Sequence, residues 1–461
     1  MEINGHPLSP ARYFAVLTMG CRVNQVETER LSQTGVAYGF YPVAAGCPPD
    51  IIIINTCSVT SESDRQARQL IRRLSRENPQ AQLVITGCYA QGNAEKLEKM
   101  PGVVLVVGNS EKEQLWEHFT RLPDTRRPLC VTPVTDRPAQ DAVVLVESFS
   151  AQESRAIQEG RVDRSRAFLQ VQDGCDSRCT FCTIPALRGP SRSFSPDYVR
   201  AQVAKYQENG YQEIVLTGIN LGAYGRDRTP PLTLAQLVAA TLPDMAAGRL
   251  RLSSLDPIDL HDDLIEQLAN QKSLCPYLHL SIQSGDDRIL KRMGRGYGRQ
   301  WLLDRLVTLR TLRPEMVLGA DLIVGFPTET ATAFQHTLDL VEEAKLTFLH
   351  VFRYSDRPGT PAAAIPGRFR VSPREMQRRS EQLRQRGTLL LANTARHWLG
   401  KRAEVLVESL QEGVARGKTA AFLPVRFLAT TPLKTGQLIP VALTGFDPEE
   451  QTLYGLSLPP A

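Results

Sequence analysis

The chain has 461 residues, 42% of them hydrophobic, and its 54 lysines and arginines stand against 49 acidic residues, a net charge of +5. At roughly 150 residues per domain this length indicates about three domains, each with enough apolar residues for a core. The small positive charge permits a polyanionic partner without requiring one. No apolar run approaches the roughly 18 residues of a membrane span, and no secretory signal is recognisable. We therefore expect a cytoplasmic protein with no membrane partner.

The first 110 residues alternate between short apolar runs and polar stretches of helical composition, such as residues 64–76. The apolar runs cover residues 13–18, 51–54, 83–86 and 103–107. Strands that alternate with helices predict a parallel sheet covered by helices. We assign residues 1–125 to this N-terminal α/β domain.

Three of these runs end in a turn that carries a cysteine, namely Cys21, Cys57 and Cys88. In a parallel sheet the carboxyl ends of the strands share one edge, where such folds place their ligands. Three thiolates at one edge predict a site for an iron–sulfur cluster with three protein ligands. The alternative is that cysteines stand at these strand ends by chance.

Residues 126–163 contain several prolines followed by a polar stretch, and we assign them to a linker. A second series of strands is predicted at residues 168–171, 214–216, 250–252, 277–282, 317–324 and 348–352. Six βα repeats in about 200 residues are too few for a closed eight-stranded barrel and predict a partial barrel over residues 164–395. The functional residues of such a barrel follow its strands.

This second domain begins with a C-x3-C-x2-C array formed by Cys175, Cys179 and Cys182. A structural zinc site has four ligands, whereas three thiolates can bind three irons of a [4Fe–4S] cluster and leave the fourth iron open for a small molecule. A zinc site with a distant fourth ligand and cysteines that fill a core are the alternatives. The cysteines outside both sets are expected to act as small apolar core residues: Cys47, Cys130 and Cys275.

The C-terminal part starts with an arginine-rich helix over residues 372–398, whose charged face is either solvated or follows phosphate groups. Apolar alternation at residues 403–407, 425–428 and 439–443, with glycines between, predicts a small all-β barrel over residues 396–461. The predicted fold class is therefore α/β, with an N-terminal parallel-sheet domain, a central partial (β/α)6 barrel and a small C-terminal β-barrel.

The array at residues 175–182, with Phe181 before its last cysteine, resembles the signature of radical S-adenosylmethionine (SAM) enzymes. Residues 216–220, 281–285, 293–297 and 321–329 follow it in the order of that superfamily's later motifs, with Asn220 where a glutamate is often found. This resemblance implies that the open iron binds SAM. It assigns further SAM contacts to Phe181, Gly218, Asn220, Ser281, Gln283, Arg295, Ile323, Gly325 and Phe352.

The N-terminal motifs narrow the resemblance to one family. Together the segments 20–27, 55–57, 86–88, 173–175 and 188–192 resemble the methylthiotransferases, and the similarity extends over nearly the whole chain, with a TRAM domain as the C-terminal barrel. The resemblance implies two [4Fe–4S] clusters and catalytic roles for all six cysteines. It further implies that the barrel cluster cleaves SAM to a carbon radical, that the other cluster carries the sulfur, and that a second SAM supplies the methyl group.

Family members act on adenosine 37 of tRNA bearing an isopentenyl or a threonylcarbamoyl group, or on an aspartate of a ribosomal protein. The form of residues 21–27 is similar to the threonylcarbamoyl branch, which usually has lysine where Arg22 stands. We therefore expect methylthio transfer to C2 of N6-threonylcarbamoyladenosine in tRNA, with the other two substrates as alternatives. Arg22 or Arg192 would contact the threonyl carboxylate, or else form a surface ion pair.

The expected partners are a tRNA anticodon loop and an electron donor such as flavodoxin or ferredoxin, whereas the sequence does not indicate the sulfur donor. Two other classes of protein stay open. A radical SAM enzyme without sulfur insertion would hold about four irons per chain rather than about eight. A non-enzymatic RNA-binding protein or cluster carrier would release no 5′-deoxyadenosine from SAM.

Overall fold

The computed structural model describes residues 12–44, 47–122, 165–245, 247–429 and 431–459. The chain forms two compact units, of which the first contains the N-terminal sheet together with residues 174–176 and 183–190. The second contains residues 163–173, 177–182 and 191–461. The predicted linker 126–163 and Cys130 lie outside the described residues, and the domain boundaries stay predictions. No helix among the described residues is long and apolar enough to cross a membrane.

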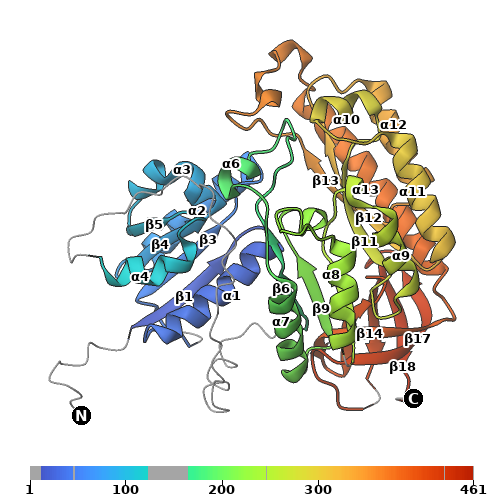
Figure 1. Cartoon of the computed structure of the whole chain (residues 1–461), viewed down its shortest axis with the longest axis horizontal. Coiled ribbons are helices and arrows are strands. Elements are labelled where there is room, and N and C mark those ends of the chain that lie inside the picture. The colour runs from blue at the N-terminus through green and yellow to red at the C-terminus, as the bar shows by residue number, and fades with distance from the viewer. Residues whose placement is uncertain (1–11, 45–46, 123–164, 246, 430, 460–461) are drawn as a thin grey trace. The chain divides into compact units, whose positions relative to one another are not determined.

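The first unit contains a five-stranded parallel sheet in the order β2-β1-β3-β4-β5. Its strands are β1 (Tyr13–Thr18), β2 (Tyr41–Pro42), β3 (Ile51–Thr56), β4 (Gln82–Gly87) and β5 (Val103–Val107). Strands β1, β3, β4 and β5 are labelled in Figure 1. Every predicted run is a strand, and the predicted parallel sheet is confirmed. The sequence did not reveal β2, because two residues are too short to show a pattern.

Helices cover both faces of this sheet, because alternate side chains of its strands point to opposite sides. Ile51 and Ile53 of β3 pack in one apolar cluster with Trp116, whereas Ile52 and Ile54 pack in the other. The first face carries α1 (Arg22–Ala37), the short η1 (Lys112–Gln114) and α4 (Leu115–Thr120), and the second carries α2 (Ser61–Glu77) and α3 (Cys88–Glu98). The fully buried apolar runs of the strands follow from this two-sided cover.

The second unit contains six parallel strands in two three-stranded sheets (Figure 1). They are β6 (Ala167–Gln170), β9 (Glu213–Thr217) and β10 (Arg249–Leu252), then β11 (Tyr277–Gln283), β12 (Val317–Val324) and β13 (Phe348–Arg353). Parallel bridges between Leu250 and Leu274 and between Leu255 and Leu280 link the two sheets. These six strands confirm the predicted partial barrel.

Helices follow the strands and bury one face of each sheet. They are α7 (Pro196–Glu208), α8 (Leu234–Thr241), α9 (Asp262–Asn270), α10 (Asp287–Met293), α11 (Arg299–Leu312) and α12 (Ala331–Glu343), with the short turns η2 (Leu221–Ala223), η3 (Leu242–Asp244), η4 (Pro257–Asp259), η5 (Pro361–Ala364) and η6 (Gly367–Phe369). Leu278, Leu280 and Ile282 of β11 belong to this helix-covered core. The alternate residues of β11 therefore face the inner side of the partial barrel. The unit also contains two antiparallel strands of two residues each, β7 (Gln172–Asp173) and β8 (Arg192–Ser193).

The long helix α13 (Pro373–Arg396) leads into a closed five-stranded barrel in the order β14-β15-β16-β18-β17. The strands are β14 (Arg402–Gln411), β15 (Val414–Thr419), β16 (Pro424–Leu428), β17 (Leu438–Asp447) and β18 (Thr452–Ser457). Three of them were predicted, whereas β15 and β18 are each interrupted by a glycine that hides their alternation. On α13, Arg378, Arg379 and Arg386 pair with carboxylates of the protein, which accounts for these three charges without phosphate groups.

One buried carboxylate joins the partial barrel to the small β-barrel within the second unit. Glu213 is fully buried, and its oxygens contact Nε of Arg166 at 2.8 Å, of Arg249 at 2.6 Å and of Arg251 at 2.9 Å. Other N–H groups of Arg249 and Arg251 donate to backbone carbonyls on and beside β14 and β15. Burial alone would raise the pKa of Glu213, but the three arginines outweigh it and hold this pKa below its usual range.

We expect Glu213→Gln to destabilise the second unit by roughly 3–5 kcal/mol, because three guanidinium groups lose their shared buried partner. The measurement is the urea midpoint of the transition that reports this unit. Since the folded pKa is lowered, the stabilisation is present above the unfolded value of about 4.3 and is lost as the pH falls, so the difference between wild type and variant should shrink in acid. Glu62→Gln, which removes an exposed ion pair with Arg65, is the control and should leave the midpoint unchanged. An equal midpoint for both variants would contradict this assignment.

Candidate functional site

The three N-terminal cysteines lie at the carboxyl edge of the five-stranded sheet, as predicted. Cys21 directly precedes α1, Cys57 follows β3 directly, and Cys88 is the first residue of α3 after β4. Gly20 has φ +101°, and a Cβ placed there would lie 2.5 Å from Cβ of Cys57. A glycine is therefore needed where these two turns meet. Sγ of Cys21 lies 3.7 Å from Oδ1 of Asn24, and the guanidinium group of Arg188 donates both to this oxygen and to Sγ of Cys88, so the structure brings all three cysteines together.

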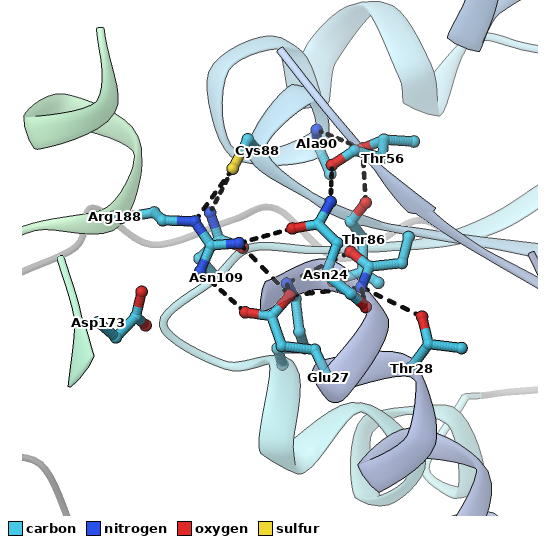
Figure 2. Close-up of polar contacts among 12 residues, drawn as sticks. Asn24, Glu27, Thr28, Thr56, Thr86, Cys88, Ala90, Asn109, Asp173 and Arg188 are labelled. Carbon is cyan, nitrogen blue, oxygen red and sulfur yellow. Dashed lines mark hydrogen bonds and ion pairs between the residues drawn. The ribbon is translucent and has the colours of Figure 1, made fainter. Parts of the chain in front are cut away.

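Arg188 is the polar centre of this edge (Figure 2). It lies on the short helix α6 (Ile184–Arg188), which belongs to the first unit, and none of its surface is exposed. Its Nε donates to Sγ of Cys88 at 3.2 Å, its Nη1 to Glu27 at 2.8 Å and its Nη2 to Oδ1 of Asn24 at 2.7 Å. The planar guanidinium group thus donates hydrogen bonds to a thiol, a carboxylate and an amide oxygen at the same time.

Glu27 and Asn24 extend the network across the edge of the sheet. The second cation on Glu27 is Lys112, whose Nζ lies 2.6 Å from the carboxylate. The side-chain amide of Asn24 donates to the carbonyls of Met19 at 2.8 Å and Thr56 at 3.1 Å, which ties the ends of β1 and β3 together. Burial would raise the pKa of Glu27, but Arg188 and Lys112 hold it below its usual range.

The sulfur atoms at this edge lie in surroundings that favour a thiolate-bound cluster. Sγ of Cys88 accepts a hydrogen bond from Arg188 and another, at 3.7 Å, from Nδ2 of Asn109. Burial raises the pKa of Cys57 to about 11, so its thiolate forms only when a metal or cation stabilises it. Iron–sulfur clusters are held by cysteine thiolates, and here two N–H groups donate to Sγ of Cys88 beside a buried cation. The residues present therefore fit a three-thiolate [4Fe–4S] cluster.

The barrel cysteines lie on one loop, of which Cys175 belongs to the first unit and Cys179 and Cys182 to the second. In the first unit, the N–H of Cys175 donates to the carbonyl of Gly189 at 3.0 Å. In the second unit, Cys182 N–H donates to the carbonyl of Cys179, and Thr180 bonds to the backbone of Met293 and Ala362. All three cysteines are partly exposed and none fills a core, so each is accessible for metal ligation.

Several of the residues predicted to bind SAM surround this loop in the second unit. Phe181 and Ile323 pack in one apolar cluster with Met293 and Phe326. The amide of Asn220 donates to Oγ of Ser177 at 3.3 Å. The remaining predicted positions also lie at strand ends or on inner faces: Gly218 against Gln172, Gln283 with φ +73°, Gly325 with φ +78° and the exposed Phe352 on β13.

Arg295 connects the cysteine loop to β11. Its guanidinium group donates to Sγ of Cys179 at 3.4 Å, to the carbonyl of Ser281 at 2.6 Å and to Asp256 at 2.7 Å. Burial would lower its pKa, but its polar neighbours raise this pKa above the usual value, so the arginine stays charged. The structure therefore brings together three of the predicted residues, Cys179, Ser281 and Arg295.

Other expectations from the sequence have mixed outcomes. The prediction that Cys47 fills a core is wrong, because Cys47 is exposed after β2, whereas Cys275 is buried as predicted. Arg192 pairs with Asp173 at 3.0 Å, which favours its ion-pair interpretation over contact with a substrate.

The sequence analysis did not identify the contact between Glu27 and Arg188, although both residues stand in the motifs that carried the resemblance. Their opposite charges, in two motifs of the same site, were the signal that could have indicated an ion pair.

Comparison with known proteins agrees with both parts of this site. Residues 13–108 match the family described as "Uncharacterized protein family UPF0004", and residues 169–341 match the radical SAM superfamily. Among solved structures, the radical SAM methyltransferase TsrM from Kitasatospora setae has a similar fold, with a TM-score of 0.52 at 15% identity over 77% of each chain.

Curated relatives extend over the length of the chain. The chain is 38% identical to threonylcarbamoyladenosine tRNA methylthiotransferase MtaB of Rickettsia prowazekii over 94% of this chain and 95% of the relative, and 33% identical to MtaB of Thermotoga maritima over 89% and 90%. It is 34% identical to tRNA-2-methylthio-N(6)-dimethylallyladenosine synthase of Roseobacter denitrificans over 94% and 96%. With two three-cysteine sets at strand ends and this similarity over both of them, the chain belongs to the radical SAM methylthiotransferase family.

Proposed function

We propose that this protein adds a methylthio group to C2 of N6-threonylcarbamoyladenosine at position 37 of tRNA. The observation that carries the proposal is the similarity, at 38% identity over nearly the full length of both chains, to a relative named for this substrate. Relatives named for dimethylallyladenosine are less similar than this relative, at 34% and 32%, and their substrate is the second candidate. A splayed anticodon loop suits both, since proteins read RNA mostly through unstacked bases.

The family uses [4Fe–4S] clusters and SAM, and the residues described above fit both. We infer that Cys21, Cys57 and Cys88 hold one cluster and that the barrel cysteines hold the other. When bound and reduced, the barrel cluster supplies an electron that cleaves SAM to a carbon radical able to attack an inert C–H bond.

The protein's own side chains would position these groups and exclude water. The apolar cluster of Phe181, Ile323 and Phe326 offers a dry wall for an adenine ring, next to the cysteine loop. Arg295 holds Cys179 against β11. The electron donor, such as flavodoxin or ferredoxin, belongs to the same proposal, and the sulfur donor is left open.

The direct test is mass spectrometry of nucleosides from total tRNA of cells with and without this gene. We expect 2-methylthio-N6-threonylcarbamoyladenosine to disappear while its unthiolated precursor accumulates. Loss of the 2-methylthio isopentenyl derivative instead would transfer the assignment to the second candidate. If all tRNA nucleosides are unchanged, the proposed function is wrong.

The two cysteine sets should have separable roles. We expect Cys179→Ala to abolish formation of 5′-deoxyadenosine from SAM, because the barrel cluster is lost. Cys57→Ala should retain this cleavage and lose only the methylthio product. Each variant should keep about four of about eight irons per chain. Equal loss of SAM cleavage in both variants would contradict the division.

We infer that Arg188 is a positioning residue for the N-terminal cluster. Arg188 is buried, donates a hydrogen bond to Sγ of the proposed ligand Cys88, and forms an ion pair with Glu27. Hydrogen bonds to the sulfurs and nearby positive charge raise the reduction potential of iron–sulfur clusters. Arg188→Lys, which keeps the charge but loses the three-way contact, should therefore lower the midpoint potential of this cluster, and Arg188→Met should lower it further.

The readout is a redox titration followed by electron paramagnetic resonance on Cys179→Ala protein, in which only the N-terminal cluster is present. Arg192→Met is the matched control, since Arg192 lies four residues away and pairs with Asp173 instead. Its potential should equal that of the parent protein. A variant that only destabilises the unit would lose iron without changing the potential of the cluster that is left, and this result would overturn the positioning role.

A further inference from the structure

A compact group of metal-ligand side chains lies on the inner face of the second sheet of the partial barrel, apart from both cysteine sets. It comprises His279 of β11, Asp321 of β12 and His350 of β13. One ligand atom from each of these residues lies within 4.8 Å of the other two. Nothing in the proposed function uses this group.

Strand pairing places the three side chains on neighbouring strands and on the same face. Asp321 is paired directly with His350, and His279 is paired with Gly319, two residues before Asp321 on the same strand. The neighbouring residues Leu278, Leu280 and Leu322 point into the helix-covered core, so the alternate positions face inward. The group is therefore built into regular strands, which hold side chains more rigidly than loops do.

The separations match those between ligands of one metal ion. Nε2 of His279 lies 3.0 Å from Oδ1 of Asp321, and Nδ1 of His350 lies 3.2 Å from the same oxygen. Two ligand atoms at about 2.1 Å from a metal, at angles between octahedral and tetrahedral values, are about 3.0–3.4 Å apart. The side chain of His350 is 63% exposed, so its ring can turn by the small amount that ligation requires.

A second layer of contacts orients two of the ligands. The hydroxyl of Tyr277 lies 2.9 Å from Nδ1 of His279, and Oγ of Ser281 donates to Oδ2 of Asp321 at 3.3 Å. A Cβ at Gly319 would lie 2.5 Å from Nδ1 of His279, so the missing side chain makes room for this ring. Metal-binding histidines characteristically hydrogen-bond through their other nitrogen, which leaves Nε2 directed at the ion.

We propose that His279, Asp321 and His350 bind one divalent transition-metal ion. Two imidazoles and one carboxylate suit zinc, iron(II) or manganese(II). Three protein ligands leave at least one position open, as in catalytic rather than structural metal sites. The alternative is a metal-free network in which both imidazoles donate to Asp321, and the two cases differ in a direct binding measurement.

The test titrates manganese(II) into the full-length protein with both clusters loaded, and detects free manganese(II) by room-temperature electron paramagnetic resonance. Manganese(II) prefers nitrogen and oxygen donors over thiolates, so the cysteines compete little. We expect one manganese(II) bound per chain, displaced by one equivalent of zinc(II). Asp321→Asn and His350→Ala should each weaken binding at least tenfold.

His397→Ala is the matched control, because His397 is an exposed histidine at the end of α13 and lies outside the proposed site. This variant should bind manganese(II) with the same affinity as wild type. His350 is itself exposed, so its removal should leave the fold intact and the iron content unchanged. If wild-type protein binds no manganese(II), or if the Asp321 and His350 variants bind it as well as wild type, the proposal is wrong. The nucleoside analysis described above does not depend on this result, so the two failures are distinguishable.

The open coordination position points to an oxygen donor as a further ligand, and this step rests on the proposed function. The threonylcarbamoyl group carries a carboxylate and a hydroxyl, whereas an isopentenyl group carries no oxygen. Free N6-threonylcarbamoyladenosine should therefore tighten manganese(II) binding and adenosine should not, since linked binding is reciprocal. If manganese(II) binds equally tightly in the presence of either nucleoside, the substrate is not a ligand of the metal, and the proposal of the metal site itself is unaffected.

Discussion

The N-terminal site depends on the buried ion pair between Glu27 and Arg188, which joins residues 161 positions apart in the sequence. Glu27 faces two buried cations, Arg188 and Lys112, so one positive charge is left over at the edge of the sheet. An uncompensated buried charge is strongly destabilising. A cluster bound by the thiolates of Cys21, Cys57 and Cys88 would supply the missing negative charge, and the donor from Arg188 to Sγ of Cys88 is placed to share it.

Both units place their candidate functional residues according to the same rule. In the five-stranded sheet, turns after β1, β3 and β4 carry the three cysteines. In the partial barrel, residues at or after the ends of β11 and β12 surround the second cysteine loop. Parallel strands bring their carboxyl ends to one edge, so side chains distant in sequence meet without any local contact between them.

This rule also explains how much could be predicted. The apolar runs located every strand of the partial barrel and, in the N-terminal sheet, the strand ends that carry the cysteines, because strands such as β3 and β5 are buried on both faces and leave a signal in a few consecutive residues. The strands β15 and β18 were missed because glycine interrupts each of them. Arg188 stood in a recognised motif, yet its partner could not be inferred, since the contact with Glu27 arises from the packing of a five-residue helix.

The inner face of β11, β12 and β13 has three layers with different chemistry. Tyr277 and Phe348 form an aromatic floor with Phe422, at ring-centroid distances of 4.8–5.8 Å. His279, Asp321 and His350 form the middle layer, and Ile323 and Phe352 lie above it. Successive layers are about 6.6 Å apart, two residues of strand. A group bound in the middle layer would therefore lie close beneath the strand ends, within reach of a substrate held there.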